Sequence, residues 1–451
     1  MDLSTRQHVH IVGAGGAGMS AIATVLAAMG HEVTGSDLKA SRMLDRLESA
    51  GVRVVVGHDA ANVEGASVVA ISSAVPESNP EVVAARRGNI PVVSRAVLLA
   101  DIASERRLIA VAGTHGKTTT SSMLALVLIE AGIRPSFIIG GDVNDMETSA
   151  IWDEGEWLVV EADESDGTFL RLRPELAVVT SVEPDHLEHY GGLAGLESAF
   201  GAFMASADRC VVAGDDRAGE LAPSSAETFG SSGAFRFQLS GISTARSFVS
   251  FSLSDGVSDL GVFELAVPGE HNARNAAAAI AAAVVVGVDP AACKRALSRY
   301  GGVARRFEFR GERNGVTFVD DYAHLPGEVT AALRAARGGG FKRVVAVFQP
   351  HRYSRVASLS DDFADAFVDA DVVIVTDIYP AGEAPRPGVT AELVVDAVRA
   401  SHPGAAVSYV QSHERLLEAL RGELRSGDCC ITLEAGDLTA LADELLSGEA
   451  W

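Results

Sequence analysis

The feature that most constrains the fold is a glycine turn between an apolar run and a helix-like stretch. Residues 113–120 read Gly-Thr-His-Gly-Lys-Thr-Thr-Thr, directly after the apolar run 108–112 and directly before the helix-like stretch 121–130. A strand that leads through a glycine turn into a helix directs backbone N–H groups and the positive end of the helix dipole at one point. The turn is therefore predicted to bind phosphate groups. The usual pattern has a further glycine where this chain has Val111.

Two side chains of this loop suit a nucleoside triphosphate. Lys117 would reach the β and γ phosphates, and the Thr118 hydroxyl would bind the Mg²⁺ ion that accompanies ATP. The chain has only four lysines and carries its other basic charge on arginine, so a lysine here indicates that a compact ammonium group is needed. The residues expected to bind ATP in this loop are Gly113, Thr114, His115, Gly116, Lys117, Thr118 and Thr119.

The length of the chain indicates how many domains it forms, and its charge excludes some classes of binding partner. At 451 residues the chain is too long for one hydrophobic core, and we expect about three domains. The net charge of −23 argues against nucleic acid as a partner, because proteins bind the phosphates of nucleic acid with clustered Lys and Arg side chains. Residues 1–10 lack an apolar signal region, and the longest apolar stretch, 276–288, is too short to span a bilayer. We therefore expect no membrane insertion and a cytoplasmic location.

Apolar runs that alternate with helix-like stretches indicate three α/β units in series. The polar stretch 104–107 is expected to link the first two units, and the next boundary falls near 301–310. Alternating Phe, Ser and Val residues over 233–267 predict a small antiparallel excursion. The expected strands are 9–12, 32–36, 52–56, 68–71, 91–93, 108–112, 157–160, 176–180, 210–213, 316–319, 344–348, 372–376 and 429–433. The predicted domains are 1–106, which is Rossmann-like, 107–303, a central P-loop ATPase α/β domain, and 304–451, which is again Rossmann-like.

A second glycine-rich turn opens the first unit. Gly13, Gly15 and Gly18 fit the G-x-G-x-x-G pattern of dinucleotide-binding folds, and Asp37 lies where such folds place a ribose-binding acid. The same geometry serves any pyrophosphate, which leaves a UDP-sugar, NAD and FAD open. We expect a UDP-type ligand, because the loop at Lys117 already supplies a second nucleotide site. The expected contacts are Gly15, Gly16, Ala17, Gly18, Met19, Ser20, Asp37 and the hydroxyls of Ser72 and Ser73.

Carboxylates gather at the end of the strand-like run 157–160. Four acids lie within the six residues 161–166, and they repel one another unless cations lie among them. Glu161, at the end of the strand, is the expected metal ligand. A neighbouring strand ends in the segment 181–187, and its His186 is the candidate ligand of a second Mg²⁺ ion, because it lies at the carboxyl end of a strand beside the phosphate loop.

Polar residues also follow two strands of the third unit. The segments 320–324 (Asp-Asp-Tyr-Ala-His) and 349–355 (Gln-Pro-His-Arg-Tyr-Ser-Arg) are expected on one rim of the sheet. Arg352 and Arg355 suit a small carboxylate, which a guanidinium group pairs with bidentately. Asn275, near the start of an alanine-rich helix, either caps that helix or holds the adenine or ribose edge of a nucleotide.

Together these motifs resemble those of the Mur ligase family over essentially the whole chain. The phosphate loop is common to Mur and folylpolyglutamate ligases, whereas 161–166, 350–355 and 377–383 are similar to blocks of the member that adds the first amino acid of the peptidoglycan stem. The resemblance implies three domains, which bind a UDP-sugar, ATP and an amino acid. It also implies an ATP-dependent, amide-forming ligase that joins L-alanine to the lactyl carboxylate of UDP-N-acetylmuramate through an acyl phosphate, with two Mg²⁺ ions.

The resemblance further implies roles for residues at matching positions. Lys117 and the loop N–H groups would stabilise the transferring phosphoryl group. Thr118 and Glu161 would hold one Mg²⁺ ion, and His186 with Glu161 the other. The residues implied in ATP binding outside the loop are Asn275, Arg306 and Asp320, those for alanine are Tyr322, His324, Arg352 and Arg355, and the catalytic set is Lys117, His186, His324, Arg352 and Arg355.

Three positions depart from the family pattern. Leu325 replaces a histidine, Arg274 stands where leucine is usual, and Glu434 replaces a glycine; we expect all three to lie beside the site and tune it. Many relatives use a carbamylated lysine, but the stretch between Lys117 and Lys294 contains none. Three alternatives stay open, namely a recycling ligase that attaches a tripeptide to the same nucleotide sugar, an NAD-dependent dehydrogenase and a non-enzymatic nucleotide-sensing module.

Overall fold

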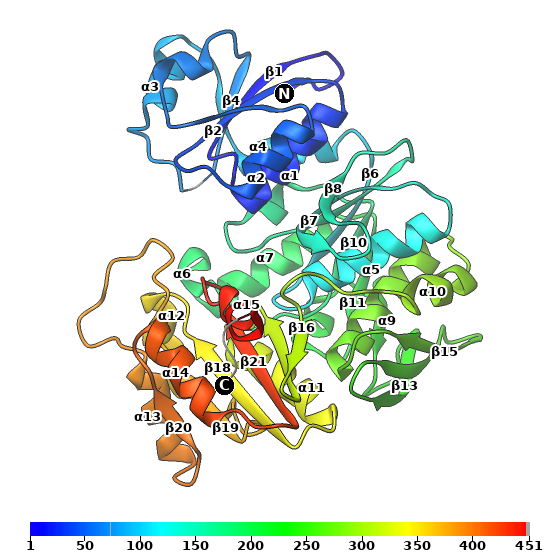
Figure 1. The fold of residues 1–451 in the computed structure, drawn as a ribbon. Helices are drawn as coiled ribbons and strands as arrows, with labels where there is room; N and C mark the ends of the chain where they lie inside the picture. The colour runs from blue at the N-terminus through cyan, green and yellow to red at the C-terminus, as the bar shows by residue number, and fades with distance from the viewer. Residues whose placement is uncertain (73, 448–451) are drawn as a thin grey trace. The chain divides into compact units, whose positions relative to one another are not determined.

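The fold is α/β, with three sheets, as the sequence predicts (Figure 1). The computed structural model describes residues 1–72 and 74–447. The chain divides into two compact units. The first unit contains the whole first sheet and most of the second, whose outer strands, within residues 237–265, are divided between the two units. The first unit comprises Met1–Ser240, Ser252–Phe263 and Arg274–Tyr300, and the second comprises Gly241–Phe251, Glu264–Ala273 and the chain from Gly301 onward.

The first sheet has five parallel strands with helices on both faces. Its elements are β1 (His8–Val12), α1 (Ala17–Ala28), β2 (Glu32–Asp37), α2 (Arg42–Ser49), β3 (Arg53–Val56), η1 (Ala60–Val63), β4 (Val68–Ile71), α3 (Pro80–Arg87), β5 (Val92–Ser94) and α4 (Arg95–Ala103). The strand order is β3-β2-β1-β4-β5. Apolar residues of α1 and α4 pack on one face, and Val63 and Ala85 pack on the other. The order of the strands reverses between β1 and β4, because β2 and β3 follow on one side of β1 and β4 and β5 on the other. Doubly wound sheets bind ligands at such a point.

The second sheet contains the strand that leads into the phosphate loop. Its strands are β6 (Arg107–Ala112), β7 (Ser136–Val143), β8 (Thr148–Ile151), β9 (Trp157–Glu161), β10 (Leu176–Val179), β11 (Arg209–Ala213), β12 (Glu227–Gly230), β13 (Phe237–Thr244), β14 (Val249–Ser254) and β15 (Asp259–Leu265), in the order β15-β14-β13-β12-β11-β10-β6-β9-β7-β8. The strands from β6 to β12 pair in parallel, except for β8, which is antiparallel to β7. The neighbouring strands β13, β14 and β15 are joined by the four-residue turns 245–248 and 255–258, which are too short for the crossover that parallel neighbours need, so the strands run antiparallel. The expected antiparallel excursion is thus confirmed.

Helices interleave with these strands along the chain. They are α5 (Lys117–Glu130), η2 (Thr168–Arg171), α6 (Leu187–Tyr190), α7 (Leu193–Ala205), α8 (Arg217–Leu221), α9 (Glu270–Val285) and α10 (Pro290–Leu297). Phe200, Phe203 and Met204 of α7 pack on the apolar face of β9 and β10. Because β6 from Leu108 onward and the whole of β10 are apolar and buried, they form the centre of the sheet, and the loops at their carboxyl ends meet.

The third sheet lies in the second unit. Its elements are β16 (Glu308–Arg313), β17 (Val316–Asp321), α11 (Pro326–Gly338), β18 (Arg343–Gln349), α12 (Tyr353–Leu359), η3 (Asp361–Asp365), β19 (Val372–Val375), α13 (Glu392–Ser401), β20 (Val407–Tyr409), α14 (His413–Glu423), β21 (Asp428–Glu434) and α15 (Ala440–Ser447). The strand order is β16-β17-β21-β18-β19-β20, parallel except for β16. Helices α11 and α13 pack on one face, and α14 and α15 on the other.

The sequence pattern predicts a domain boundary near 301–310 and no strand there. The structure places strand β16, Glu308–Arg313, at the end of this stretch. The structure shows a hairpin whose turn is Asn314-Gly315, with positive φ at both residues. Asn-Gly is the preferred pair for such a turn. Within residues 1–72 and 74–447, no helix is both long and apolar enough to cross a membrane.

Candidate active site

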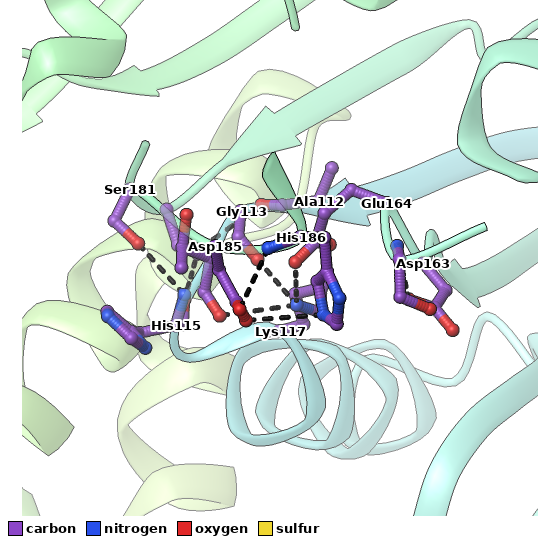
Figure 2. Close-up of polar contacts among 12 residues, drawn as sticks. Ala112, Gly113, His115, Lys117, Asp163, Glu164, Ser181, Asp185 and His186 are labelled. Atoms are coloured by element: carbon purple, nitrogen blue, oxygen red, sulfur yellow. Dashed lines mark hydrogen bonds and ion pairs between the residues drawn. The ribbon is translucent and has the colours of Figure 1, made fainter. Parts of the chain in front are cut away.

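The phosphate loop joins β6 to α5 and is shaped by the end of β10. The N–H groups of Thr114 and His115 donate to Ser181 O and Ser181 Oγ, both at 3.0 Å (Figure 2). Gly113 has φ +137°, and a Cβ atom there would collide with Thr180. Gly116 has φ +80° and caps α5. Both glycines are therefore required by the backbone, and the loop has the strand–turn–helix form expected from the sequence.

Lys117 lies in the first turn of α5 and donates to three acceptors. Its Nζ is 2.7 Å from Gly113 O, 3.3 Å from Thr114 O and 2.8 Å from Glu164 Oε1 (Figure 2). Burial acts to lower the pKa of Lys117, but the carboxylates of Glu164 and Asp163 outweigh burial and raise it. The ammonium group therefore stays charged, which phosphate binding requires.

Glu164 is the buried partner of Lys117. Its side chain is 3% exposed, and among the described residues its Oε2 has no hydrogen-bond partner. Burial raises the pKa of Glu164 to about 7, against the attraction of Lys117. The Tyr190 hydroxyl donates to the backbone carbonyl of Glu164 and so holds the loop in place. A phosphate group that binds Lys117 would displace this carboxylate.

The remaining acids of the 161–166 cluster have different partners. Arg95 Nη2 donates to Asp163 at 3.2 Å and to Asp166 at 2.9 Å. Glu161 instead accepts from Thr118 Oγ1 at 2.9 Å and from Gly140 N at 2.6 Å. Within the described residues Glu161 forms no direct ion pair with a lysine or arginine. Glu161 is thus the acid of this cluster that is left for a metal ion.

The contact between Thr118 and Glu161 fits a Mg²⁺ site of the phosphate-loop type. Such an ion usually takes one or two protein ligands and completes its octahedron with phosphate oxygens and water. Accordingly, no group of three or more His, Cys, Asp or Glu side chains in residues 1–72 and 74–447 forms a metal site by itself. His186 Nε2 lies 3.2 Å from Asp185 Oδ2, and Figure 2 shows both near Lys117.

The glycine turn of the first sheet is held by the end of β2. The N–H groups of Gly13 and Ala14 donate to Ser36 O at 2.8 and 2.9 Å, and Gly15 N donates to Asp37 Oδ2 at 2.9 Å. The carboxylate of Asp37 therefore braces the turn. Ser72 follows β4 as expected, whereas Ser73 lies outside the described residues.

Sequence reasoning did not identify Arg95 as a site residue. It is the first residue of α4, and its Nη1 would lie 2.8 Å from a Cβ atom at Gly18. The guanidinium group thus sits at the start of α1 and also pairs with Asp163 and Asp166. These acids lie about 70 residues away along the chain, so no local pattern reveals the contact.

Of the residues expected to hold ATP outside the loop, Asn275 belongs to the first unit, and Arg306 and Asp320 belong to the second. Asn275 Oδ1 occupies the space where a side chain at Gly116 would lie, so its amide rests on the phosphate loop. Arg306 lies over the Tyr322 ring, 5.1 Å from its centroid. Asp320 is fully buried, and it accepts from Thr432 Oγ1 at 2.6 Å. Direct contact of Asp320 with ATP would require the side chain to move.

Aromatic and basic side chains cluster at the rim of the third sheet. The His324 ring lies 5.4 Å from Tyr322 and 5.5 Å from His351, which stacks on Tyr379 at 5.7 Å. Arg355 Nη1 is 2.9 Å from His351 Nδ1. The structure therefore brings together three predicted residues, Tyr322, His324 and Arg355, through the unpredicted His351 and Tyr379. His351 could have been found in the segment 349–355, which places it at the end of β18.

Arg352, Leu325 and Glu434 each have a defined structural position, and the last two depart from the family pattern. Arg352 adopts φ +69° and donates from its N–H to Tyr379 O at 2.8 Å. Leu325 is buried and precedes α11. Glu434 is fully buried; it accepts from Arg305, from Thr439 Oγ1 at 2.7 Å and from Gly436 N at 2.5 Å. Its charge is therefore compensated, as a buried carboxylate requires.

Asp321, the second acid of the 320–324 segment, should make stability depend on pH. It accepts from Phe307 N and Ala323 N, both at 2.8 Å, yet burial raises its pKa to about 7. The folded state therefore binds a proton that the unfolded state releases near pH 4, and we expect this contribution to the free energy of unfolding to fall as pH rises from about 4 to about 7. In urea unfolding, the free energy of unfolding of Asp321→Asn relative to that of the wild type should rise as pH rises from about 4 to about 7. A difference that does not change with pH would contradict the assignment.

The fold and the loop geometry define a multidomain α/β protein built around a strand–turn–helix loop of the phosphate-binding type. Comparison with protein families matches three successive regions of the chain. The catalytic domain of the Mur ligase family matches residues 8–107, the Mur ligase middle domain matches 111–283, and the Mur ligase glutamate ligase domain matches 305–436. The chain belongs to the Mur ligase family.

Individual relatives match along nearly the full length. The UDP-N-acetylmuramate–L-alanine ligase of Rubrobacter xylanophilus is 47% identical over 450 residues, covering 97% of this chain and 99% of the relative. That of Geobacter sp. is 45% identical, covering 98% and 97%. The crystal structure of UDP-N-acetylmuramate-alanine ligase from Thermotoga maritima matches with a TM-score of 0.83 at 29% identity, covering 98% of each chain. The three-domain α/β class is confirmed, and the boundaries after residues 106 and 303 remain predictions.

Proposed function

We propose that this protein joins L-alanine to the lactyl carboxylate of UDP-N-acetylmuramate with hydrolysis of ATP. The observation that carries the proposal is the phosphate loop, with Lys117 paired to Glu164 and Thr118 in contact with Glu161. Relatives of 45–47% identity over nearly the full chain carry the name of this ligase, which supports the choice of substrates.

The chain's own residues account for binding and orientation of ATP. Lys117 and the N–H groups of the loop would hold the β and γ phosphates and stabilise the charge of the transferring phosphoryl group. Thr118 and Glu161 would hold one Mg²⁺ ion, and His186 with Glu161 a second. Bound Mg²⁺ supplies charge neutralisation between the triphosphate and the substrate carboxylate. Asn275, on the phosphate loop, would contact the nucleotide.

The proposed reaction has two steps, phosphoryl transfer to the substrate carboxylate and then formation of the amide bond. A carboxylate oxygen of UDP-N-acetylmuramate attacks the γ phosphorus of ATP; the bond to ADP breaks and an acyl phosphate forms. The amine of L-alanine then attacks the acyl carbon, a proton leaves the nitrogen, and inorganic phosphate departs. Tyr322, His324, Arg352 and Arg355 would bind alanine and orient its amine. Arg355 is buried beside His351, so a bidentate pair with the alanine carboxylate would draw on a side chain already held in place.

We also propose that the glycine turn of the first sheet binds the UDP-sugar. The protein would act in the cytoplasm, where nucleotide sugars and ATP are available. Arg95 lies at this turn, and we expect Arg95→Gln to raise the KM for UDP-N-acetylmuramate by about ten- to a hundredfold, because a charge-assisted hydrogen bond to the diphosphate is lost. Steady-state kinetics would measure the change. Arg107→Gln, which removes an exposed pair with Glu175, is the matched control. Equal KM values for both variants would rule out a role for Arg95 in substrate binding.

The recycling ligase is the second candidate, because the murein peptide ligase from Psychrobacter arcticus shares the fold, with a TM-score of 0.72 at 24% identity. The test is phosphate release from ATP with Mg²⁺ and UDP-N-acetylmuramate, to which L-alanine, another single amino acid or the tripeptide is added in turn. Release that needs both the nucleotide sugar and L-alanine would support the proposal. Release with the tripeptide alone would favour the recycling reaction, and no release in any combination would reject both.

A further inference from the structure

Arg274 and Asp215 form an ion pair that neither the reaction nor the family motif explains. Arg274 Nη1 donates to Asp215 Oδ2 at 2.9 Å, and Nη2 donates to Asp215 Oδ1 at 2.5 Å. This two-point geometry is the strongest form of a guanidinium–carboxylate contact. Both residues belong to the first unit. The pair connects α9, near its start, with the segment that follows β11.

Asp215 is itself fixed by the end of β12. Its carboxylate accepts from Ser231 N at 2.8 Å, Ser231 Oγ at 3.2 Å and Ser232 N at 3.2 Å. The side chain is only 6% exposed. Burial works against its charge, but Arg274 and the two backbone N–H groups hold the pKa of Asp215 well below its usual range. Asp215 is thus a rigid anchor rather than a solvated surface charge.

The residue after Arg274 lies on the phosphate loop. Gly116 has φ +80°, and Asn275 Oδ1 fills the position that a side chain at Gly116 would occupy. Helix α5 begins at the next residue, Lys117. The orientation of α9 at Arg274 and Asn275 therefore decides whether the Asn275 amide rests against the loop or moves away from it.

We propose that Arg274 is a positioning residue for ATP: its pair with Asp215 holds α9 so that Asn275 braces the phosphate loop at Gly116. This inference rests on the proposed function, because it takes ATP as the ligand of the loop. A loop that already has its bound shape loses less conformational entropy when the triphosphate binds. The pair acts through Asn275 and need not touch the nucleotide.

Arg274→Leu, which introduces the residue usual in the family motif, is the principal test. Isothermal titration of the full-length protein with ATP and Mg²⁺, in the absence of the other substrates, should show a Kd raised about three- to thirtyfold. Arg274→Lys keeps the charge but loses the two-point contact, so its Kd should lie between those of the wild type and Arg274→Leu. Arg274→Leu/Asp215→Asn removes the unpaired carboxylate and should bind ATP as weakly as Arg274→Leu while recovering stability.

Arg209 provides a matched control at the opposite end of the same helix. Its Nη1 donates to Val285 O, the last residue of α9, at 2.7 Å. Arg209→Leu therefore removes an arginine contact with α9 far from Gly116, and we expect its Kd for ATP to stay within about twofold of the wild type. A purely structural role for Arg274 would lower the urea midpoint of unfolding without changing the Kd, which would overturn the inference. Equal changes in the Kd for ATP in Arg209→Leu and Arg274→Leu would also overturn the inference. If the wild type itself did not bind ATP, the proposed function would be rejected.

Discussion

Replacing Lys117 with methionine is expected to lower the rate of phosphate release from ATP by at least about a thousandfold. Lys117 is the lysine of the loop sequence, and its Nζ is held there by Gly113 O and Thr114 O, with Glu164 as the acceptor that a phosphate group would replace. Methionine fills a similar volume but cannot donate a hydrogen bond or stabilise negative charge. Pre-steady-state measurement of phosphate release with all substrates present would test this expectation.

The variant also removes the partner of a buried carboxylate, so misfolding must be separated from lost chemistry. Burial already raises the pKa of Glu164 to about 7, and without Lys117 the carboxyl group would stay protonated at neutral pH, at a cost in stability. Lys117→Met/Glu164→Gln places a neutral amide there and should fold as stably as the wild type while remaining inactive. Lys342→Met, at an exposed lysine of the second unit, should keep full activity. Recovery of activity in the double variant would show that Lys117 acts only by neutralising Glu164.

The parts of the fold that were predicted correctly are those specified by local pattern. Apart from Arg107 at the start of β6 and Glu161 at the end of β9, the strands β6, β9 and β10 are continuous apolar runs, because they are buried on both faces of a parallel sheet. The phosphate loop was also predictable, since its glycines, lysine and threonines are adjacent in the chain and its conformation follows from the turn they impose. In contrast, the edge strand β16 reads Glu-Phe-Arg-Gly-Glu-Arg and carries little apolar signal, because an edge strand is half exposed.

The partners of the site residues could not be predicted, because they come from distant parts of the chain. The sequence showed four acids within 161–166 and required cations among them. The structure supplies these cations as Lys117 and Arg95, which come from different elements. Glu434 was recognised as a departure from the family pattern, but its compensation by Arg305 joins residues 129 positions apart. Such pairs depend on tertiary packing, which a single sequence does not reveal.

Glu161→Gln should reduce turnover about a hundredfold and raise the Mg²⁺ concentration needed for half-maximal activity. Glu161 contacts Thr118 and Gly140, and it is the acid of the cluster without a direct ion pair within the described residues. Glutamine is a close match in shape: its amide oxygen can accept from Gly140 N, and its amide nitrogen can donate to Thr118 Oγ1. The substitution therefore removes the negative charge while preserving both contacts, so the unfolding free energy should change little.

Titration of activity with Mg²⁺ distinguishes a metal ligand from a structural acid. If Glu161 binds the ion, part of the activity of Glu161→Gln should return at high Mg²⁺, because a weakened site fills by mass action. Glu156→Gln is the matched control, since Glu156 directly precedes the same strand, β9, and its side chain is 81% exposed. Its activity and its Mg²⁺ dependence should equal those of the wild type. If turnover of Glu161→Gln fell a hundredfold while the Mg²⁺ concentration for half-maximal activity stayed unchanged, Glu161 would act by orienting Thr118 and not as a metal ligand. The ligands of the ion would then be the phosphate oxygens and the threonine hydroxyl.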